Sequence, residues 1–394
     1  MTVVEFFDKD SIENVVSSLL CYPDKVVFIG DNSKEMDRAK AKYKKLVQSR
    51  GKNIEFISMS VTRNNLEDIV EKLNEIIDKF GDIEIDLTGG EDLYLVGAGI
   101  IFNAHPDKVK LHRFNINNSV LYDCDADGNV LNSTPEKLSV EENIAIYGGR
   151  VVYDTETSNG THKWSFDKEF VSDVDIMWDI CCSDPKMWNN VMKCIEFDEV
   201  SEERLSETSF KTPATTFHNV PEIVNELKKY GLIDNVEISN GYLAFDCKNA
   251  QIKDCLSKSG QLLEIKTASE LLELNDLGNE IVDDILTGAL IYWDNDDPTD
   301  KDVINEVDVI VMKGLVPVFV SCKNGAIDVN ELYKLNTVAT HFGGKYAKKV
   351  LVATNDADAI RSRADEMNIR VVDKLLTIDQ DSKDFRKKIK SILN

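Results

Sequence analysis

The sequence predicts a chain of the α/β class, with two α/β units and a less regular segment between them. Over residues 25–123, short apolar runs that are typical of buried strands alternate with segments of helical spacing. Over residues 260–394, strands and helices alternate again. For residues 25–123, such alternation indicates a parallel sheet with helices on both faces. A chain of 394 residues has room for two or three domains.

The first unit is expected to follow a regular strand–helix order. Its predicted elements are strands at residues 25–30, 53–58, 83–87, 109–115 and 120–123 and helices at residues 34–50, 66–80 and 93–102. Ligands of such sheets bind beyond the carboxyl ends of the strands. Two turns with glycines and small polar residues are expected there, and they contain Gly30, Asp31, Asn32, Ser33, Thr88, Gly89 and Gly90.

These two turns favour a ligand that carries phosphate. Glycine lets the backbone approach a ligand closely, and the N–H groups at helix starts attract anions. Neither turn has the GxGxxG pattern of dinucleotide-binding dehydrogenases or the pattern of a Walker A loop. An ordinary strand-to-helix turn is the alternative for residues 88–90.

The middle of the chain, residues 165–260, is the least regular part. Trp178 and Trp188 predict packed helices. A helix at residues 220–230 is followed by a hairpin at residues 236–247, an order that is compatible with a winged helix. Such a module binds nucleic acid in some proteins and is a spacer or dimer element in others.

The last unit contains the most informative stretch, residues 305–325. It is typical of a β-hairpin whose first strand carries Asp308 and whose second strand ends in Ser321, Cys322 and Lys323. Acidic residues on one strand therefore face a lysine on its partner. Solvated strand ends are the alternative, because charged residues are common at such positions.

The strand before this hairpin adds a further acidic residue. The preceding strand ends in Asp294, so Asp294, Asp308 and Lys323 are expected on one side of a small sheet. An aspartate supplies a hard oxygen ligand for Mg²⁺ or Mn²⁺. A nearby lysine orients or deprotonates water and stabilises charge on a phosphate. Glu306 shares a face with Asp308 on an alternating strand and is a candidate supporting group. These are the minimum requirements for metal-assisted phosphodiester cleavage.

The composition limits the class of protein. The net charge of −24 argues against broad, non-specific nucleic-acid binding, although a nuclease needs only local positive charge. No stretch approaches the roughly 20 apolar residues of a membrane helix, so no membrane partner is expected. The eight cysteines form no CxxC pair and no zinc-ligand spacing. We therefore expect a reduced, cytoplasmic protein.

Both ends of the chain resemble one group of proteins. The turns at residues 30–33 and 86–90 resemble those of the CARF domain, the Rossmann-like sensor of CRISPR-linked effectors. Residues 138–149, with Ser139 as a helix cap, resemble the connector of the same proteins. The last unit is similar to the PD-(D/E)xK nuclease fold, with its marks at Glu264, Asp294, residues 305–308, residues 319–325 and residues 342–345.

Together these features resemble the type III CRISPR ancillary nucleases that fuse a CARF sensor to such a nuclease. The resemblance implies a CARF domain at residues 1–150, a connector and winged-helix-like region at residues 151–259 and a restriction-endonuclease-like domain at residues 260–394. It also implies a homodimer that binds one cyclic oligoadenylate. The expected activator is cyclic tetra-adenylate, with the hexa-adenylate as the runner-up. Metal-dependent cleavage of single-stranded DNA or RNA, or of plasmid DNA, is the expected activity.

The resemblance assigns roles residue by residue. The implied metal ligands are Glu264, Asp294, Asp308 and the carbonyl group of Cys322, with Lys323 as the motif lysine. Serine at position 321 departs from the usual acid of the motif, and Glu280 competes with Glu264 for the role of helical acid. In the sensor, the residues of the two glycine-containing turns named above are expected to line the ring pocket.

Two other functions fit parts of the sequence. A ligand-responsive transcription regulator would use the sensor and the middle region, but it leaves Asp294, Asp308 and Lys323 without a role. A ligand-independent restriction or repair nuclease would use the last unit alone. The preference for DNA or RNA, the ring size and the degradation of the ring by the sensor stay open at this point.

Overall fold

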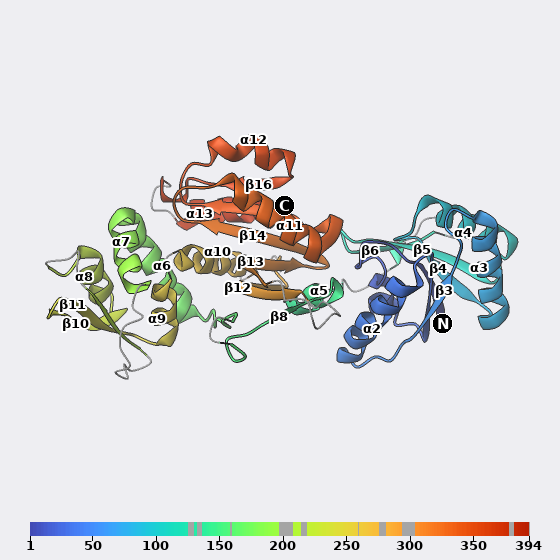
Figure 1. The fold of residues 1–394 in the computed structure, drawn as a ribbon, viewed down its shortest axis with the longest axis horizontal. Coiled ribbons are helices and arrows are strands. Elements are labelled where there is room, and N and C mark those ends of the chain that lie inside the picture. Colours follow the sequence, from blue (N-terminus) through green and yellow to red (C-terminus); the bar gives the residue numbers. More distant parts are fainter. Residues whose placement is uncertain are drawn as a thin grey trace.

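The computed structural model describes residues 1–124, 130–131, 136–157, 160–196, 208–213, 219–258, 260–275, 281–293, 304–377 and 382–393. Figure 1 shows an elongated molecule with the N-terminal unit at one end, the C-terminal unit in the centre and a middle unit at the other end. In the described part of the chain, no helix has the length and apolarity that crossing a membrane requires.

The N-terminal unit is a seven-stranded sheet in the order β3-β2-β1-β4-β5-β6-β7. The strands β1 to β5 are parallel, and β6 and β7 continue the sheet as antiparallel strands. Its elements are β1 (Thr2–Phe6), α1 (Val16–Cys21), β2 (Lys25–Gly30), α2 (Ser33–Ser49), β3 (Glu55–Ser60), α3 (Leu66–Phe80), β4 (Ile83–Asp86), α4 (Asp92–Ala104), β5 (Val109–Asn115), β6 (Val120–Asp123) and β7 (Val130–Leu131). The predicted α/β class is confirmed.

The sequence-based strand order is wrong in one respect, because it omits β1. This strand lies in the centre of the sheet, between β2 and β4. Glu5 interrupts its apolar run, yet only 1% of Glu5 is exposed. Burial raises the pKa of the Glu5 carboxyl well above its ordinary value, and the nearby Asp86 raises it further. A buried acid inside a five-residue strand hides the pattern on which the sequence analysis depends.

The C-terminal unit contains a six-stranded sheet in the order β16-β15-β14-β13-β12-β8. The hairpin expected at residues 305–325 is present, because β13 and β14 pair antiparallel and Gly314 adopts a φ of 61° in their turn. The elements are α5 (Val140–Ile146), β8 (Gly149–Val151), α10 (Gln261–Leu274), β12 (Asp284–Trp293), β13 (Ile304–Lys313), β14 (Val316–Lys323), α11 (Val329–Gly343), the 3₁₀ turn η2 (Gly344–Tyr346), β15 (Lys348–Ala353), α12 (Asp358–Glu366), β16 (Ile369–Val372), η3 (Leu375–Thr377), α13 (Ser382–Lys390) and η4 (Ser391–Leu393).

In its described residues, the middle unit combines four helices with a three-stranded sheet in the order β10-β11-β9. The predicted hairpin is present, and its turn residues Asn240 and Gly241 have φ values of 52° and 80°, which this tight turn requires. Trp178 and Trp188 are buried in its core, as expected. The elements are α6 (Lys168–Ser183), α7 (Pro185–Glu196), β9 (Ser209–Pro213), α8 (Glu222–Lys229), β10 (Ile233–Ser239), β11 (Tyr242–Cys247) and α9 (Ala250–Ser257).

Two of the three apolar cores cross the boundaries between units. One core joins the middle unit to α10 and to one face of the C-terminal sheet. A second core runs from α2 through α5 to the other face of that sheet and to α11; Tyr43, Ile144 and Phe342 belong to it. The third core lies within the N-terminal unit, beside α3 and α4. The N-terminal and C-terminal units are therefore joined by continuous packing as well as by the chain.

Candidate functional site

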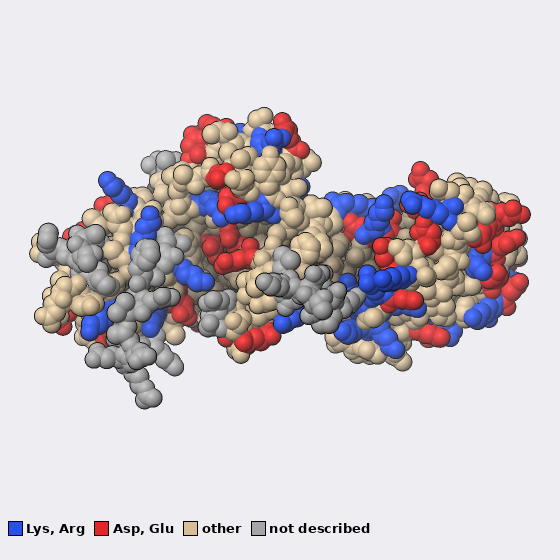
Figure 2. Space-filling model, in the orientation of Figure 1, with Lys and Arg blue, Asp and Glu red and all other residues tan. Residues whose placement is uncertain are grey.

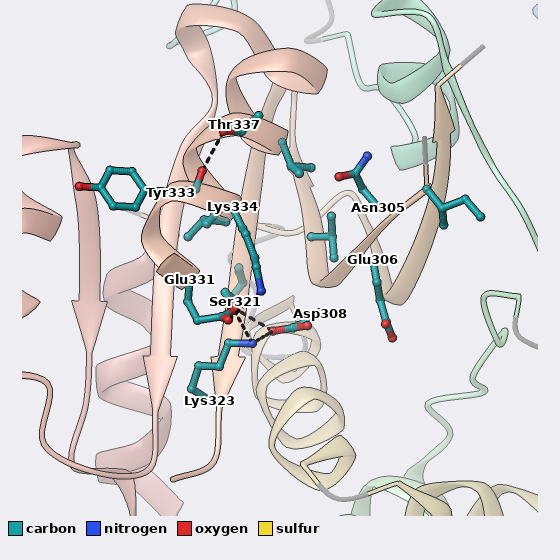
Figure 3. A pocket seen from close by; sticks show the side chains of 14 residues that line it. Asn305, Glu306, Asp308, Ser321, Lys323, Glu331, Tyr333, Lys334 and Thr337 are labelled. Carbon is teal, nitrogen blue, oxygen red and sulfur yellow. Dashed lines mark hydrogen bonds and ion pairs between the residues drawn. The ribbon is translucent and has the colours of Figure 1, made fainter. Parts of the chain in front are cut away.

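Pairing of β13 with β14 brings the predicted catalytic residues together. Val309 pairs with Val320, so Asp308 and Ser321 lie side by side where the pairing of the two strands ends. The Asp308 carboxylate accepts a 2.5 Å hydrogen bond from the main-chain N–H of Cys322 and a 3.1 Å bond from the Ser321 hydroxyl. The Lys323 ammonium lies 3.9 Å from the same oxygen. Figure 3 shows these side chains converging.

An irregularity of β13 at Asp308 determines on which face of the sheet the residues around it lie. Val307 packs in the core beside α11, whereas Val309 packs in the core beside α10. Strict alternation would place both residues on one face, so the strand changes faces at Asp308. On β12, Gly288 lies opposite Asp308, between the pairs Thr287–Val309 and Ala289–Val307.

Gly288 has a φ of 55°, a conformation that other residues adopt at a cost. Such local irregularities of strands commonly reorient a side chain beside an active site.

The helix α10 brings Glu264 near enough to Asp308 for their charges to interact. Its packing onto β14 is marked by a 3.9 Å contact between the Thr267 hydroxyl and the Cys322 thiol. Within the helix, the Lys266 ammonium pairs with Glu270, of which only 1% is exposed. Lys266 also pairs with Asp175 on α6, and Glu270 pairs with Arg386 on α13, so these two ion pairs tie α10 to its neighbours.

The electrostatics of the site indicate an excess of negative charge. Burial raises the pKa of the Glu264 carboxyl well above its ordinary value, and the charges of Asp308 and Glu306 raise it further. Burial also raises the pKa of Asp308, while Lys323 and the hydrogen bond from Cys322 oppose this shift. Neighbouring, partly exposed carboxylates such as these are oxygen donors that Mg²⁺ and Mn²⁺ bind. The residues present therefore fit a divalent cation.

The remaining predicted ligands differ in what the structure says of them. Asp294 and Glu280 lie outside the described residues. The Cys322 side chain is buried and burial raises the pKa of its thiol, so only its carbonyl group remains as a metal donor. Ser321 donates a hydrogen bond to Asp308 and so orients that carboxylate. Unlike the usual acid of the motif, it adds no negative charge.

A cavity of about 560 Å³ opens beside Asp308 and Lys323 and runs along α11. Figure 2 shows acidic side chains in a hollow over the central part of the molecule, with Lys and Arg side chains at its border. Glu331 in the first turn of α11 also lines this cavity, and its carboxylate lies 2.9 Å from the Lys323 ammonium. The sequence analysis missed Glu331, because a glutamate in a first helical turn is common for reasons of helix stability alone.

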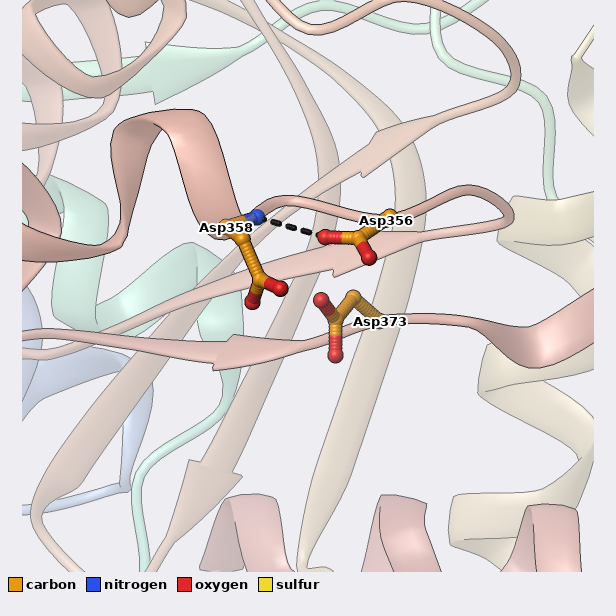
Figure 4. Close-up of side chains that lie close together, drawn as sticks. All are labelled: Asp356, Asp358 and Asp373. Atoms are coloured by element: carbon orange, nitrogen blue, oxygen red, sulfur yellow. Dashed lines mark hydrogen bonds between the residues drawn. The ribbon is translucent and has the colours of Figure 1, made fainter.

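A second group of acids is not assigned to a metal. Asp356, Asp358 and Asp373 place their oxygens within 4.8 Å of one another (Figure 4). Lys374 lies 2.8 Å from Asp356, and Arg361 lies 2.7 Å from Asp373. These two cations balance most of the negative charge, so the cluster is a surface ion-pair network.

The N-terminal sheet forms a second pocket at the carboxyl ends of its central strands. The adjacent strands β2, β1 and β4 end at one edge, as a parallel sheet requires. A cavity of about 560 Å³ lies there, lined by Phe7, Asp8, Lys9, Asp31, Asn32, Glu35, Arg63 and Glu91. Four of these side chains are acidic and two are basic, and Arg63 lies 3.4 Å from Asp31.

The predicted ligand-binding turns take different positions around this pocket. Asp31 and Asn32 line it directly, and the Asn32 side chain also caps α2 by accepting from the Glu35 N–H at 3.2 Å. Gly30 is buried behind them, and Ser33 is exposed on α2 without lining the cavity.

The second turn supports the pocket from beneath. The Thr88 hydroxyl accepts from the Phe114 N–H at 2.8 Å, and the Gly90 N–H donates to Asp8 at 3.1 Å. A Cβ at Gly89 would lie 3.2 Å from the Cβ of Asp8, so this turn is in contact with the loop after β1. That loop, which supplies Phe7, Asp8 and Lys9, was missed together with β1.

Comparisons with solved structures give matches over the whole chain. Protein VC1899 from Vibrio cholerae aligns with a TM-score of 0.75 and 16% identity, over 99% of this chain and 98% of its own. Can2 from Sulfobacillus thermosulfidooxidans, solved in complex with cyclic tetra-adenylate, aligns with a TM-score of 0.69 and 16% identity, over 100% of this chain and 99% of its own. The chain has the Can2 fold.

The fold class expected from the resemblance is therefore confirmed. No protein-family model matches the sequence, and no curated protein matches it either. At 16% identity the likeness to Can2 and VC1899 concerns the fold. The roles of individual residues depend on the geometry described above.

Proposed function

We propose that this chain is a metal-dependent endonuclease of type III CRISPR defence that a cyclic oligoadenylate switches on. The proposed activator is cyclic tetra-adenylate, and the proposed substrates are DNA, RNA or both. The observation that carries the proposal is the convergence of Asp308, Ser321 and Lys323 at the end of one hairpin. It occurs in a chain with the fold of a protein solved with cyclic tetra-adenylate.

The active site is proposed to use Asp308, Glu264 and the Cys322 carbonyl group as metal ligands, together with Asp294. A bound Mg²⁺ or Mn²⁺ supplies a Lewis acid that polarises the phosphate and lowers the pKa of a bound water. Within the chain itself, Cys322 and Ser321 fix the orientation of the Asp308 carboxylate. The Lys323 ammonium stabilises negative charge that develops on the phosphate.

The N-terminal pocket is the proposed binding site for the ring. Its lining is not basic overall, so charge alone does not select a polyanion. We propose that phosphates are bound by N–H groups at the start of α2 and by Lys9 and Arg63. Arg63 would then exchange its partner Asp31 for a phosphate.

A homodimer is proposed because α4 presents an apolar face to solvent. Leu95, Val96 and Ile100 are 36%, 51% and 42% exposed, and they lie on one side of this helix. Contiguous exposed apolar residues of this kind mark interaction surfaces. The residue before α4, Glu91, lines the ring pocket. Pairing of two copies through α4 would therefore bring two pockets close to one axis.

Cleavage assays with defined substrates test this function. Labelled single-stranded DNA, single-stranded RNA and supercoiled plasmid are incubated with Mn²⁺ or Mg²⁺, with and without cyclic tetra-adenylate or cyclic hexa-adenylate. We expect cleavage that requires a metal and one ring size and that Asp308→Ala abolishes. Absence of cleavage under every condition, with ring binding intact, would contradict the proposal and favour a ligand-responsive regulator.

A further inference from the structure

The lysine of the active site is bound more closely by a helix than by its catalytic partner. The Lys323 ammonium lies 2.9 Å from Glu331 and 3.9 Å from Asp308. Glu331 belongs to the first turn of α11, not to the strands that carry the motif. It is 22% exposed and Lys323 is 29% exposed, so water screens this pair only in part. Lys323 is therefore held on the α11 side of the site.

The other end of α11 is held by the N-terminal unit. In the turn η2, which follows the helix directly, the Lys345 N–H donates a 2.7 Å bond to Asp10. The Lys345 ammonium lies 2.8 Å from Glu13, and the Tyr346 hydroxyl donates a 2.5 Å bond to the same carboxylate. Asp10 and Glu13 are 7% and 2% exposed. These bonds join the end of α11 firmly to the loop after β1.

The same loop forms part of the ring pocket. Asp8 lines the pocket, accepts from the Gly90 N–H and accepts from the Asp10 N–H at 2.9 Å. A Cβ at Gly89 would lie 3.1 Å from the Cβ of Glu13. Asp8, the turn at Gly89 and Glu13 are therefore close neighbours, and we infer that a ligand that displaces Asp8 also shifts Glu13.

The helix α11 connects the two sites as one packed element. From Glu331 to Gly343 an α-helix spans roughly 20 Å at its usual rise. Leu332, Ala339 and Phe342 are fully buried along it, in the core that also contains residues of α2. Packed elements shift between discrete arrangements more readily than they deform.

We propose that Glu331 holds Lys323 away from the reaction centre until the sensor binds its ligand, and that α11 transmits the movement of the sensor to Glu331. This inference depends on the proposed function. Glu331 is a positioning residue that acts through Lys323. When α11 shifts, the Glu331–Lys323 pair opens and the ammonium moves to the side of Asp308.

The first test replaces Glu331 by glutamine. Basal cleavage without a ring and cleavage with saturating cyclic tetra-adenylate are measured, and each is resolved into kcat and KM. We expect the basal kcat of Glu331→Gln to rise about fivefold, the size of one partly exposed ion pair, with KM unchanged. The activation ratio falls by the same factor. A basal kcat at or below that of the wild type overturns the proposal.

A matched control separates this effect from a change of charge. Glu366→Gln removes one carboxylate of the same unit, which pairs with Arg363 on the surface of α12. We expect this variant to keep the basal rate and the activation of the wild type. An equal rise in both variants would overturn the assignment to Glu331.

The second test breaks the other end of the connection. Tyr346→Phe removes only the hydroxyl that donates to Glu13. We expect unchanged ring affinity by calorimetry, an unchanged basal rate and a stimulated rate reduced about fivefold, as for one lost hydrogen bond. In the Glu331→Gln background the same change should have no further effect. Additive effects, or full activation of Tyr346→Phe, would contradict transmission through α11.

Failure of the proposed function looks different from failure of this inference. If wild-type protein does not cleave, or cleaves equally with and without a ring, the proposed function and the role of Glu331 are both wrong. If wild-type protein is activated normally but Glu331→Gln keeps a low basal rate, only the role of Glu331 is lost.

Discussion

The Lys323 ammonium lies 3.9 Å from the Asp308 carboxylate, a distance that joins them electrostatically without a direct hydrogen bond. The carboxylate is fixed by its bond from the Cys322 N–H, whereas the lysine is free to approach it once its other contacts open. In the proposed nuclease, a water beside this pair would be within hydrogen-bonding reach of both groups.

Removal of Lys323 is expected to affect the chemical step. Lys323→Met keeps an unbranched side chain of similar bulk and loses its charge, so we expect kcat to fall by roughly 10²–10³ with little change in KM. Ser321→Ala is the comparison, because the Cys322 N–H still holds Asp308; its kcat should fall by about tenfold or less. Steady-state cleavage in the presence of ring and metal measures both. A Lys323→Met enzyme within tenfold of the wild type would exclude Lys323 from the mechanism.

Glu264 is expected to weaken the metal-free fold as the pH rises. Its folded-state pKa is above the ordinary value of 4.5, so the folded protein binds this proton more tightly than the unfolded chain. Stability from this group is therefore present below pH 4.5 and is lost as the pH rises toward the folded-state pKa. Glu264→Gln removes this dependence.

Thermal unfolding from pH 4 to pH 8 tests this prediction. In a chelator, Glu264→Gln should melt above the wild type at pH 8, and the difference should shrink toward pH 4. Added Mn²⁺ should raise the melting temperature of the wild type more than that of the variant. If the wild type melts at a higher temperature than Glu264→Gln at pH 8 in chelator, the prediction is wrong, because other groups of the folded protein then stabilise the charged Glu264 carboxylate.

Gly288 is expected to support both the fold and the site. Its φ of 55° disfavours any side chain, while no atom lies within 4 Å of an added Cβ. Gly288→Ala should therefore lower the free energy of unfolding by about 1–2 kcal/mol through the backbone alone. Because Asp308 lies opposite, cleavage should fall as well. Gly99→Ala, on the exposed face of α4 and without a positive φ, should not destabilise the protein. Equal denaturation midpoints for both variants would argue against the strand irregularity.

The apolar face of α4 is expected to form the dimer. Ile100→Glu places a charge on this face, so the chain should become monomeric and lose ring-stimulated cleavage. Gln48→Glu adds the same charge to an exposed position of α2, away from this face, and should leave the dimer intact. Sedimentation or light scattering measures the mass of each variant. An Ile100→Glu protein that remains a dimer would place the interface elsewhere.

The sequence correctly predicted the elements that have clear caps or turn residues at their ends. The bounds of α3, Leu66–Phe80, match the prediction because Asn65 caps the helix and Gly81 ends it. The hairpin of β13 and β14 was predictable because two apolar runs flank a glycine turn. The meeting of Asp308 with Lys323 followed from that pairing.

Other features depend on packing that the sequence does not display. Glu264 comes near Asp308 through the placement of α10, which its ion pairs to Asp175 and Arg386 help to fix. In the sequence, Gly288 only predicts a weakened strand. Its position opposite Asp308 is known only from the pairing of β12 with β13. In the sequence, Glu331 is an ordinary acid of a first helical turn. Its ion pair with Lys323 follows from the packing of α11 beside β14. The loop of Asp8 was hidden because β1 contains a buried glutamate.

The most direct test of the central claim is the initial rate of cleavage of one labelled single strand as cyclic tetra-adenylate is titrated at a fixed Mn²⁺ concentration. Wild type and Lys323→Met are compared, and ring binding is measured for both. We expect a rate that rises to saturation with the ring for the wild type, no cleavage without metal, and equal ring affinity with almost no cleavage for Lys323→Met. A rate that does not depend on the ring, or a Lys323→Met protein that cleaves like the wild type, would contradict the account.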